Sequence, residues 1–368
     1  MSRCPTCGTV YPPEARFCPR DGARLLDTAG AGPAPAAAGL AAAGVTSAVA
    51  HRDAMPAGAP ELKRGELVHD RYEVEHKLGE GGMSSVYLVR DIATGDRYAM
   101  KVLHRSLSSD EKAMARLRRE AGFGMRLAHP NVCHILQLGE TAGGLVYVVM
   151  PYIEGEVLSD RVFRRGALPL AEVVRHVQDI AAGLHVAHRL GIVHRDLKPE
   201  NVMICPRPDG TDTAVVMDFG LAKERRADAE VQKLTATGII LGTPEFMSPE
   251  QIRGKPLDPR SDVYALALMT FEMLTGRLPF PGSTAQEVMI ARLRGEPLSL
   301  RAVRPDLVVP EGVDRAVRQG LASDPVDRFR TAPDFATALA AGAAGTSGGT
   351  EESWLARLRG RRMTEGGG

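Results

Sequence analysis

The spacing of apolar residues changes between residues 85 and 127. Residues 85–90 and 97–103 are rich in β-branched and aromatic side chains, as strands are, and Thr94-Gly95-Asp96 between them is a typical turn sequence. In residues 110–127, apolar side chains recur at intervals of three and four, which is the period of an amphipathic helix. The apolar face consists of Met114, Leu117, Ala121 and Met125, preceded by the capping candidates Ser108 and Ser109. The pattern predicts two strands and then a helix.

Composition divides the chain into four segments. Residues 1–26 form a compact segment with three cysteines, and residues 27–65 are dominated by Ala, Gly and Pro, which is typical of a flexible linker. Residues 66–340 have the pattern of a folded domain, strand-like first and helical later. Residues 341–368 return to Gly, Ser and Thr and predict a flexible tail.

The overall composition is that of an ordinary globular protein. Of 368 residues, 44% are hydrophobic and 25% charged, and the formal net charge is +1, which argues against a nucleic-acid coat protein and a wholly disordered chain. The five cysteines are an odd number crowded toward the N-terminus, so we expect no disulfide framework. Because no run of 18 strongly apolar residues and no signal-peptide core occurs, we predict a cytoplasmic protein without a membrane span.

Two features near the predicted strands suit phosphate chemistry. Residues 78–86, L-G-E-G-G-M-S-S-V, contain three glycines, where backbone N–H groups can approach phosphate oxygens; taken alone, such a run is more often a simple hairpin turn. Lys101 lies in an apolar strand, where its ammonium needs a counter-charge, and Glu120 on the predicted helix can supply one. A surface lysine on an edge strand is the alternative.

The decisive signal lies in residues 192–220. Residues 192–204 read I-V-H-R-D-L-K-P-E-N-V-M-I, and residues 215–220 read V-V-M-D-F-G. Following the glycine run in this order, they resemble the motifs of the eukaryotic-like Ser/Thr protein kinases of bacteria over residues 72–339. The resemblance implies an α+β, bilobal fold, with a small, mainly β N-lobe that has one helix and a large helical C-lobe. It also implies transfer of the γ-phosphoryl group of ATP to Ser/Thr hydroxyls of proteins, in signal transduction.

The resemblance implies how the phosphates of ATP are held. Lys101 would hold the α- and β-phosphates while paired with Glu120. Asp218 and Asn201 would bind Mg²⁺ or Mn²⁺, because hard cations prefer oxygen ligands.

The resemblance also implies the acceptor side of the site and the nucleotide pocket. Asp196 would orient the substrate hydroxyl and accept its proton. Lys198 would contact the γ-phosphate, and tyrosine kinases usually lack a lysine at this position. The Ile153 backbone would bond adenine. The residues implied for ATP binding are Leu78, Gly79, Glu80, Gly81, Gly82, Met83, Ser84, Ser85, Val86, Ala99, Lys101, Met150, Ile153 and Met203.

Residues 221–250 resemble an activation loop and the peptide platform that follows it. Because Arg195 precedes the catalytic aspartate, a phosphate on the loop could bind its guanidinium. Thr235 and Thr237 are therefore the predicted autophosphorylation sites, and unmodified, solvated threonines are the alternative. The resemblance further implies that Glu250 pairs with Arg328.

One departure from the family pattern lies in the helix that carries Glu120. Gly124 stands where a large apolar side chain normally joins a stack with a histidine and a phenylalanine, and Gly122 is close by. Each glycine costs a helix about 1 kcal/mol relative to alanine. We therefore predict a soft helix whose active position depends on phosphorylation or a partner, unless Phe123 or Met125 fills the gap.

The first segment looks like a zinc ribbon with one substitution. Cys4, Cys7, Cys18 and Asp21 form a C-x₂-C-x₁₀-C-x₂-D pattern, in which the carboxylate stands where a fourth cysteine is usual. So few apolar side chains could not bury a core without a metal. We predict a Zn²⁺-binding module that acts as a sensor or as a docking site for a protein partner, with no nucleic acid expected; a metal-free disordered arm is the alternative.

The tail leaves two interpretations open. Residues 353–362 combine Trp354 and two leucines with four arginines, a composition that could lie on a partner or on anionic lipid. Since an isolated helix of about a dozen residues is marginal, a disordered tail is favoured.

Three functions are compatible with these motifs. An active Ser/Thr protein kinase that uses Mg-ATP is favoured because every chemical position is filled. A pseudokinase scaffold would have been favoured by loss of Lys101, Asp196 or Asp218. A kinase of small molecules would generally lack the G-T-P…E platform motif at residues 242–250.

Overall fold

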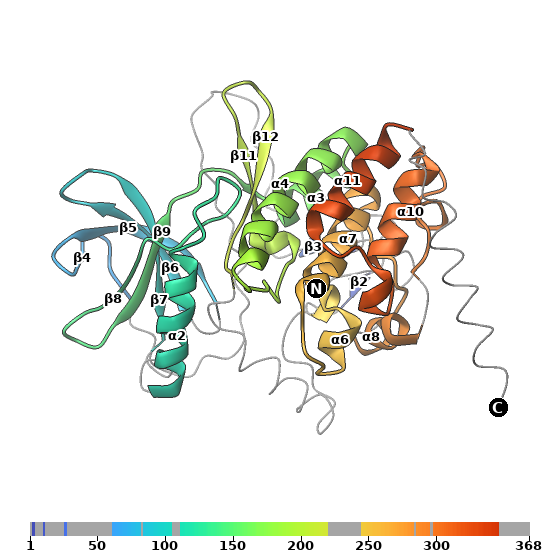
Figure 1. Ribbon diagram of the computed structural model, residues 1–368. Coiled ribbons are helices and arrows are strands. Elements are labelled where there is room, and N and C mark those ends of the chain that lie inside the picture. The colour runs from blue at the N-terminus through green and yellow to red at the C-terminus, as the bar shows by residue number, and fades with distance from the viewer. Residues whose placement is uncertain are drawn as a thin grey trace, which may run out of the picture.

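The computed structural model describes two lobes of one large domain and a separate small sheet. It describes residues 61–81, 84–104, 111–219, 244–282, 285–294 and 297–345, together with the strand residues 2–3, 10–11 and 26–27. In the large domain a β-sheet with one helix is followed by a mostly helical lobe (Figure 1). The predicted α+β, bilobal architecture, with a mainly β N-lobe and a helical C-lobe, is therefore confirmed.

The N-lobe is a six-stranded antiparallel sheet with the strand order β4-β5-β6-β7-β9-β8. Its strands are β4 (Leu67–Val68), β5 (Tyr72–Glu80), β6 (Ser84–Asp91), β7 (Arg97–Leu103), β8 (Gln137–Glu140) and β9 (Val146–Pro151). The two predicted strands are β6 and β7, which pair with Val86 opposite Lys101. The predicted turn joins them, and Gly95 there has φ +79°, which glycine adopts without steric cost.

Each face of this sheet buries its own apolar cluster. On one face Leu62 packs against side chains of β5, β6, β7 and β9, and its backbone N–H donates to the Tyr87 hydroxyl at 3.3 Å. The linker predicted to reach residue 65 is therefore too long at this end, because Leu62 is only 8% exposed and belongs to the domain core. At the other end the domain also extends further than predicted, since α11 (Ala332–Ala343) continues past residue 340.

Among the described residues of the N-lobe, α2 (Glu111–Gly124) is the one helix. Met114, Leu117 and Ala121 are buried, as the period predicts. Met125 was assigned to the same face incorrectly, because the helix ends at Gly124 and Met125 is 42% exposed. The capping candidates Ser108 and Ser109 lie outside the described residues.

The C-lobe is built around helix α7 (Pro259–Thr275), in which every residue from Ser261 to Thr275 is buried. Asp258 caps its N-terminus through the Arg260 N–H, and Gly276 ends it in the left-handed conformation. The other helices are α3 (Leu158–Arg165), α4 (Leu170–Arg189), α6 (Pro249–Ile252), α8 (Ala285–Arg294), α9 (Leu300–Val303), α10 (Glu311–Gly320), α11, and the 3₁₀ turns η1 (Pro199–Asn201), η2 (Pro244–Phe246) and η3 (Pro325–Asp327). No helix in the described ranges is both long and apolar enough to cross a membrane.

A small sheet packs on α3 and α4 of the C-lobe, and the loop that follows α2 reaches it. β10 (Glu156–Val157), β11 (Val202–Pro206) and β12 (Asp212–Val216) form an antiparallel sheet in that order. The Asn131 side chain donates to the Ala214 carbonyl at 2.8 Å, and Val216 N–H donates to the Asn131 carbonyl at 2.9 Å. The chain that follows α2 is thus anchored on the C-lobe.

A second small sheet belongs to the N-terminal segment. β1 (Ser2–Arg3) pairs antiparallel with both β2 (Val10–Tyr11) and β3 (Leu26–Asp27), in the order β2-β1-β3. The predicted zinc ligands Cys4, Cys7, Cys18 and Asp21 lie outside the described residues.

Candidate active site

The loop that carries the H-R-D motif is fixed to the first turn of α7. The Asp262 carboxylate, 1% exposed, accepts the backbone N–H groups of His194 at 2.8 Å and Arg195 at 3.1 Å. Its Oδ2 also lies 2.7 Å from His188 Nε2 on α4. A buried carboxylate needs such donors, and in turn it holds the loop in one geometry.

Two residues of the site adopt backbone conformations that are rare outside glycine. Arg195 has φ +67° and Asp218 has φ +53°. Such conformations cost free energy and persist where surrounding contacts impose them. For Arg195 one such contact is the Gln251 side chain, whose amide donates to the Arg195 carbonyl at 2.7 Å.

Two polar side chains of the catalytic loop, those of Lys198 and Asn201, meet the Asp196 carboxylate. Lys198 Nζ lies 3.4 Å from Asp196 Oδ2. The Asn201 amide nitrogen donates to the same oxygen at 3.1 Å and to the Asp196 carbonyl at 2.8 Å. This arrangement orients the carboxylate and leaves the Asn201 side-chain carbonyl as the group able to ligate a cation.

An ion pair between Lys101 and Asp218 joins the two lobes across the site. Lys101 Nζ on β7 lies 2.8 Å from Asp218 Oδ1, although 117 positions separate them in the chain. Burial by itself would raise the pKa of Asp218, but Lys101 beside it holds that pKa below its ordinary value. The carboxyl remains 41% exposed, so it is charged and accessible to a hydrated cation.

Apolar side chains from both lobes line the nucleotide pocket implied by the sequence. Ala99, Met150 and Met203 are buried in one cluster, and Leu78, Val86 and Ile153 pack against it. The β5–β6 hairpin closes over it with Gly81 N–H donating to the Ser84 carbonyl at 2.8 Å. Gly82 and Met83 at the tip of the hairpin lie outside the described residues.

The space next to Gly124 is filled, so the predicted gap in the internal stack is not there. A Cβ added to Gly124 would lie 2.6 Å from Ile135 Cδ1. The side chain found in this space is that of Ile135, which is buried. His194 and Phe219 do stack, with ring centroids 4.8 Å apart.

The predicted pair between Glu250 and Arg328 is confirmed. Arg328 donates from Nη1 and Nη2 to the two carboxylate oxygens at 2.7 and 2.8 Å, and Ser261 Oγ donates to Glu250 at 2.7 Å. Burial opposes ionisation, but these donors hold the pKa of Glu250 below its ordinary value. The Arg328 guanidinium also lies over the Tyr264 ring, 4.7 Å from its centroid.

Sequence reasoning missed Gln251, although a local signal was available. Ser248 and Gln251 form a capping box at the start of α6, the S-x-x-Q pattern of a helix N-terminus. Its Gln251 oxygen accepts the Ser248 N–H at 2.9 Å, which leaves the amide nitrogen to reach Arg195. The capping box thus links the platform segment to the catalytic loop.

Four groups of predicted residues cannot be placed beside this site. The Glu120 side chain, the threonines Thr235 and Thr237, the tail residues 353–362 and the cysteine module lie outside the described residues or side chains.

Another group of metal-type ligands lies between α4 and β12, and an arginine of α3 occupies it. Glu172, His176 and Asp212 bring carboxylate and imidazole atoms within 4.8 Å of one another. Arg161 donates to Glu172 at 3.2 Å and makes a short contact with Asp212. Because a guanidinium already supplies the positive charge, this cluster is an ion-pair network rather than a cation site. Burial lowers the pKa of His176 and keeps the ring neutral there.

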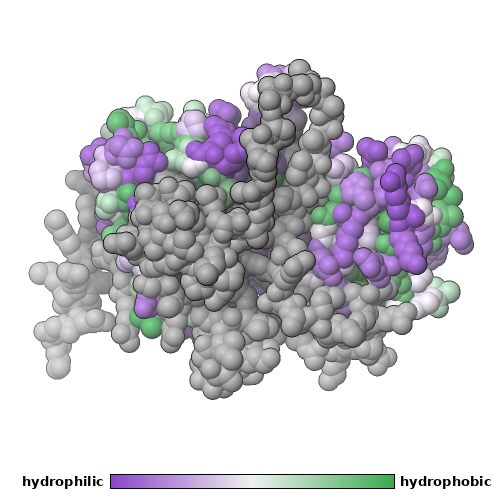
Figure 2. All heavy atoms as spheres, turned by 180° about the vertical axis from the view of Figure 1, so that it is seen from behind, coloured by the Kyte–Doolittle hydropathy of each residue, from purple (hydrophilic) through white to green (hydrophobic). Residues whose placement is uncertain are grey.

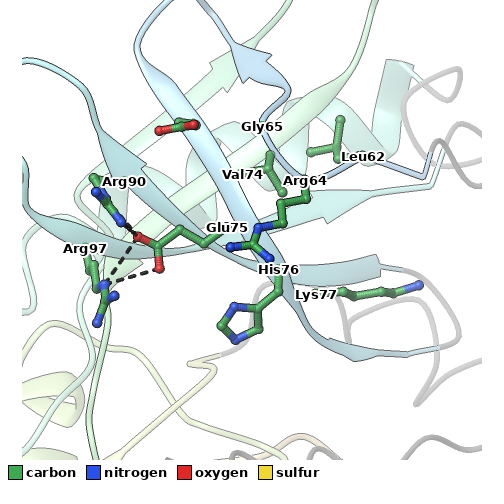
Figure 3. Close-up of a pocket in the computed structure, with 10 residues that line it drawn as sticks. Leu62, Arg64, Gly65, Val74, Glu75, His76, Lys77, Arg90 and Arg97 are labelled. Carbon is green, nitrogen blue, oxygen red and sulfur yellow. Dashed lines mark hydrogen bonds and ion pairs between the residues drawn. The ribbon is translucent and has the colours of Figure 1, made fainter.

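A pocket of about 800 Å³ lies on the N-lobe sheet, away from the catalytic residues (Figure 3). Within it Glu75 of β5 holds Arg90 of β6 and Arg97 of β7 (Figure 3). From behind, the described surface at this end of the molecule is mainly hydrophilic (Figure 2). This ion-pair group ties three neighbouring strands together on that face of the sheet.

Comparison with known proteins agrees with the geometry. The family model described as "Protein kinase domain" matches residues 72–331. The chain is 38% identical over 277 residues to the serine/threonine-protein kinase pkn3 of Myxococcus xanthus, which covers 75% of this chain and 51% of pkn3. It is 39% identical to PknB of Mycobacterium leprae, covering 72% of this chain and 42% of PknB. It is 36% identical to PrkC of Bacillus subtilis, covering 74% and 40%.

The kinase domain of Mycobacterium tuberculosis PknI superimposes with a TM-score of 0.60 and 29% identity, covering 77% of this chain and all of that domain. The chain therefore belongs to the protein kinase family. Its kinase domain is related to those of these bacterial serine/threonine protein kinases. The chain spans about half or less of the length of the relatives pkn3, PknB and PrkC.

Proposed function

We propose that the protein is an active serine/threonine kinase that transfers the γ-phosphoryl group of ATP to hydroxyls of proteins. The observation that carries this proposal is the contact between Lys101 and Asp218, 2.8 Å apart, beside the oriented Asp196 carboxylate. Phosphoryl transfer depends mainly on positioning and on neutralising phosphate charge. All the charged groups that this chemistry needs are present in the chain.

Asp218 and Asn201 are the residues that we propose to hold Mg²⁺ or Mn²⁺. The ionised and partly exposed Asp218 carboxylate and the side-chain carbonyl of Asn201 suit a hard cation. When bound, the cation would neutralise charge on the phosphates.

Asp196 is proposed to position the acceptor hydroxyl and take its proton. Its carboxylate is held by the Asn201 amide and lies 3.4 Å from Lys198, so it is oriented before a substrate arrives. Lys198 is proposed to turn to the γ-phosphate, and Lys101 to hold the α- and β-phosphates. The apolar cluster around Ala99 supports an adenine site in the same place.

Autophosphorylation of Thr235 or Thr237 is proposed to stabilise the active state. Arg195 supports this proposal because it belongs to the catalytic loop and its carbonyl is bound by Gln251 of α6. A phosphothreonine bound by the Arg195 guanidinium would therefore tie the activation loop to the catalytic loop. The test is phosphosite mapping after incubation with Mg-ATP, with Asp196→Asn as the inactive control. Phosphate on either threonine in the wild type alone is expected. No transfer by wild type that still binds ATP would favour the pseudokinase alternative.

The N-terminal segment is proposed to be a zinc module that docks a protein partner. Its three short strands pair around β1, so the chain between β1 and β2, with Cys4 and Cys7, and the chain between β2 and β3, with Cys18 and Asp21, both begin and end on one sheet. This supports a single site with ligands from both of these segments. We expect one Zn²⁺ per wild-type chain and loss of it in Cys18→Ser. Equal metal content in both would overturn the proposal.

A further inference from the structure

Arg292 on α8 is the largest side chain that is fully buried in the described domain, with 1% exposure. Its Nη1 donates to the Met247 carbonyl at 2.9 Å and its Nη2 to the Glu245 carbonyl at 2.5 Å. Its guanidinium carbon lies 5.4 Å from the centroid of the Phe280 ring. One arginine thus grips two carbonyls that are two residues apart in another segment.

Burying the guanidinium charge of Arg292 lowers the stability of the fold, so we expect the residue to have a role other than stabilisation. Burial lowers the pKa of Arg292, which means that the protein interior disfavours its charge. The planar guanidinium, however, presents donors in a fixed fork that matches two acceptors at once. A lysine has a single ammonium, and an apolar residue would leave both carbonyls without this donor.

The segment that Arg292 grips lies directly beside the catalytic loop. Phe246 and Met247 line one pocket together with Arg195 and Asp196. At the following turn, Gln251 donates to the Arg195 carbonyl. The segment is thus held from the catalytic side by Gln251 and from the α8 side by Arg292, and α6 and α8 lie next to each other in Figure 1.

We infer that Arg292 is a positioning residue for the protein substrate, because it fixes the position of the backbone of residues 245–247 next to Asp196. This inference rests on the proposed kinase activity. The Lys101–Asp218 contact belongs to the nucleotide side and does not involve this segment. Loss of the grip should therefore weaken the use of the protein substrate and leave the use of ATP unchanged.

The test compares Arg292→Met and Arg292→Lys with the wild type. The matched control is Arg253→Met, because Arg253 is also near α8 and donates to a backbone carbonyl, that of Leu293 at 3.2 Å, but is exposed. Initial rates of phosphorylation are measured at varied concentrations of myelin basic protein with saturating ATP, and at varied ATP with a fixed concentration of myelin basic protein. The rate of ATP hydrolysis is measured without a protein substrate. Melting temperatures are measured for all four proteins.

We expect Arg292→Met to raise the KM for the protein about tenfold, equivalent to about 1.4 kcal/mol, with KM for ATP and ATP hydrolysis within about twofold of wild type. The KM of Arg292→Lys for the protein should lie between those of the wild type and Arg292→Met, and the KM of Arg253→Met should equal that of the wild type. An unchanged protein KM, or equal losses for protein, ATP and hydrolysis, would overturn the inference. A wild type that transfers no phosphate would instead refute the proposed function.

Hydrogen exchange adds a readout that does not depend on catalysis. Peptides that cover residues 244–252 should exchange faster in Arg292→Met than in wild type or Arg253→Met, while peptides that cover α7 stay protected. Unchanged exchange in residues 244–252 would overturn the inference even if the rates differ.

Discussion

Two glycines in α2 are expected to respond to alanine in opposite ways. Gly122 is exposed, and a Cβ added there would have no heavy atom within 4 Å. Gly122→Ala should therefore stabilise the domain by about 1 kcal/mol through helix propensity. For a domain of this size that corresponds to a rise in melting temperature of about 2–4 °C.

At Gly124 the same substitution meets the core. The new Cβ would lie 2.6 Å from Cδ1 and 3.0 Å from Cγ1 of Ile135, which is buried at 5% exposure. Overpacking of this kind costs about 1–3 kcal/mol, and the propensity gain is smaller because Gly124 is the last residue of the helix. We expect Gly124→Ala to lower the melting temperature.

A double-mutant cycle separates the contact from the propensity. Ile135→Val removes Cδ1, so it should cost about 0.5–1.5 kcal/mol alone but less in the presence of Gly124→Ala. Thermal unfolding followed by circular dichroism measures all four proteins. Additive effects, or a Gly124→Ala protein as stable as Gly122→Ala, would refute the argument from Ile135.

The pair also tests whether a soft α2 limits activity. If it does, Gly122→Ala should raise the basal autophosphorylation rate together with the melting temperature. A higher melting temperature with an unchanged rate would contradict the soft-helix hypothesis.

Three further outcomes are expected. Arg328→Met leaves the Glu250 charge buried without its partner and should cost about 3–5 kcal/mol in unfolding free energy, measured by urea denaturation; a cost below 1 kcal/mol would contradict the buried-pair argument. The folded-state pKa of Glu250 is depressed, so the stability from this pair should be present above about pH 4.3, the ordinary glutamate value, and be lost as the pH falls through the folded pKa. Parallel curves of unfolding free energy against pH for the wild type and Arg328→Met would contradict this expectation. Lys101→Met should lower phosphotransfer about 10²–10³-fold with an unchanged fold by circular dichroism, and near-wild-type rates would refute its phosphate role.

Local signals in the sequence were sufficient for the elements and for the identity of the catalytic loop. The strands β6 and β7 and the helix α2 follow from their periods, since alternation and the 3.6-residue repeat are properties of the backbone. The end of α2 was placed incorrectly because the apolar residue Met125 continues the period beyond the point where the helix stops. The capping box at Ser248 was also visible, but its use by Gln251 to reach Arg195 was not.

The sequence alone determined which chemical groups the protein has and, through its motifs, the class of reaction that they serve. Only the tertiary structure decided which of these groups meet. Lys101 and Asp218 come into contact across 117 positions, Ile135 fills the space that Gly124 leaves, and Arg292 reaches the platform from a helix about 45 residues away. These contacts depend on how lobes and helices pack, and side chains that meet by packing leave no periodic trace in the chain.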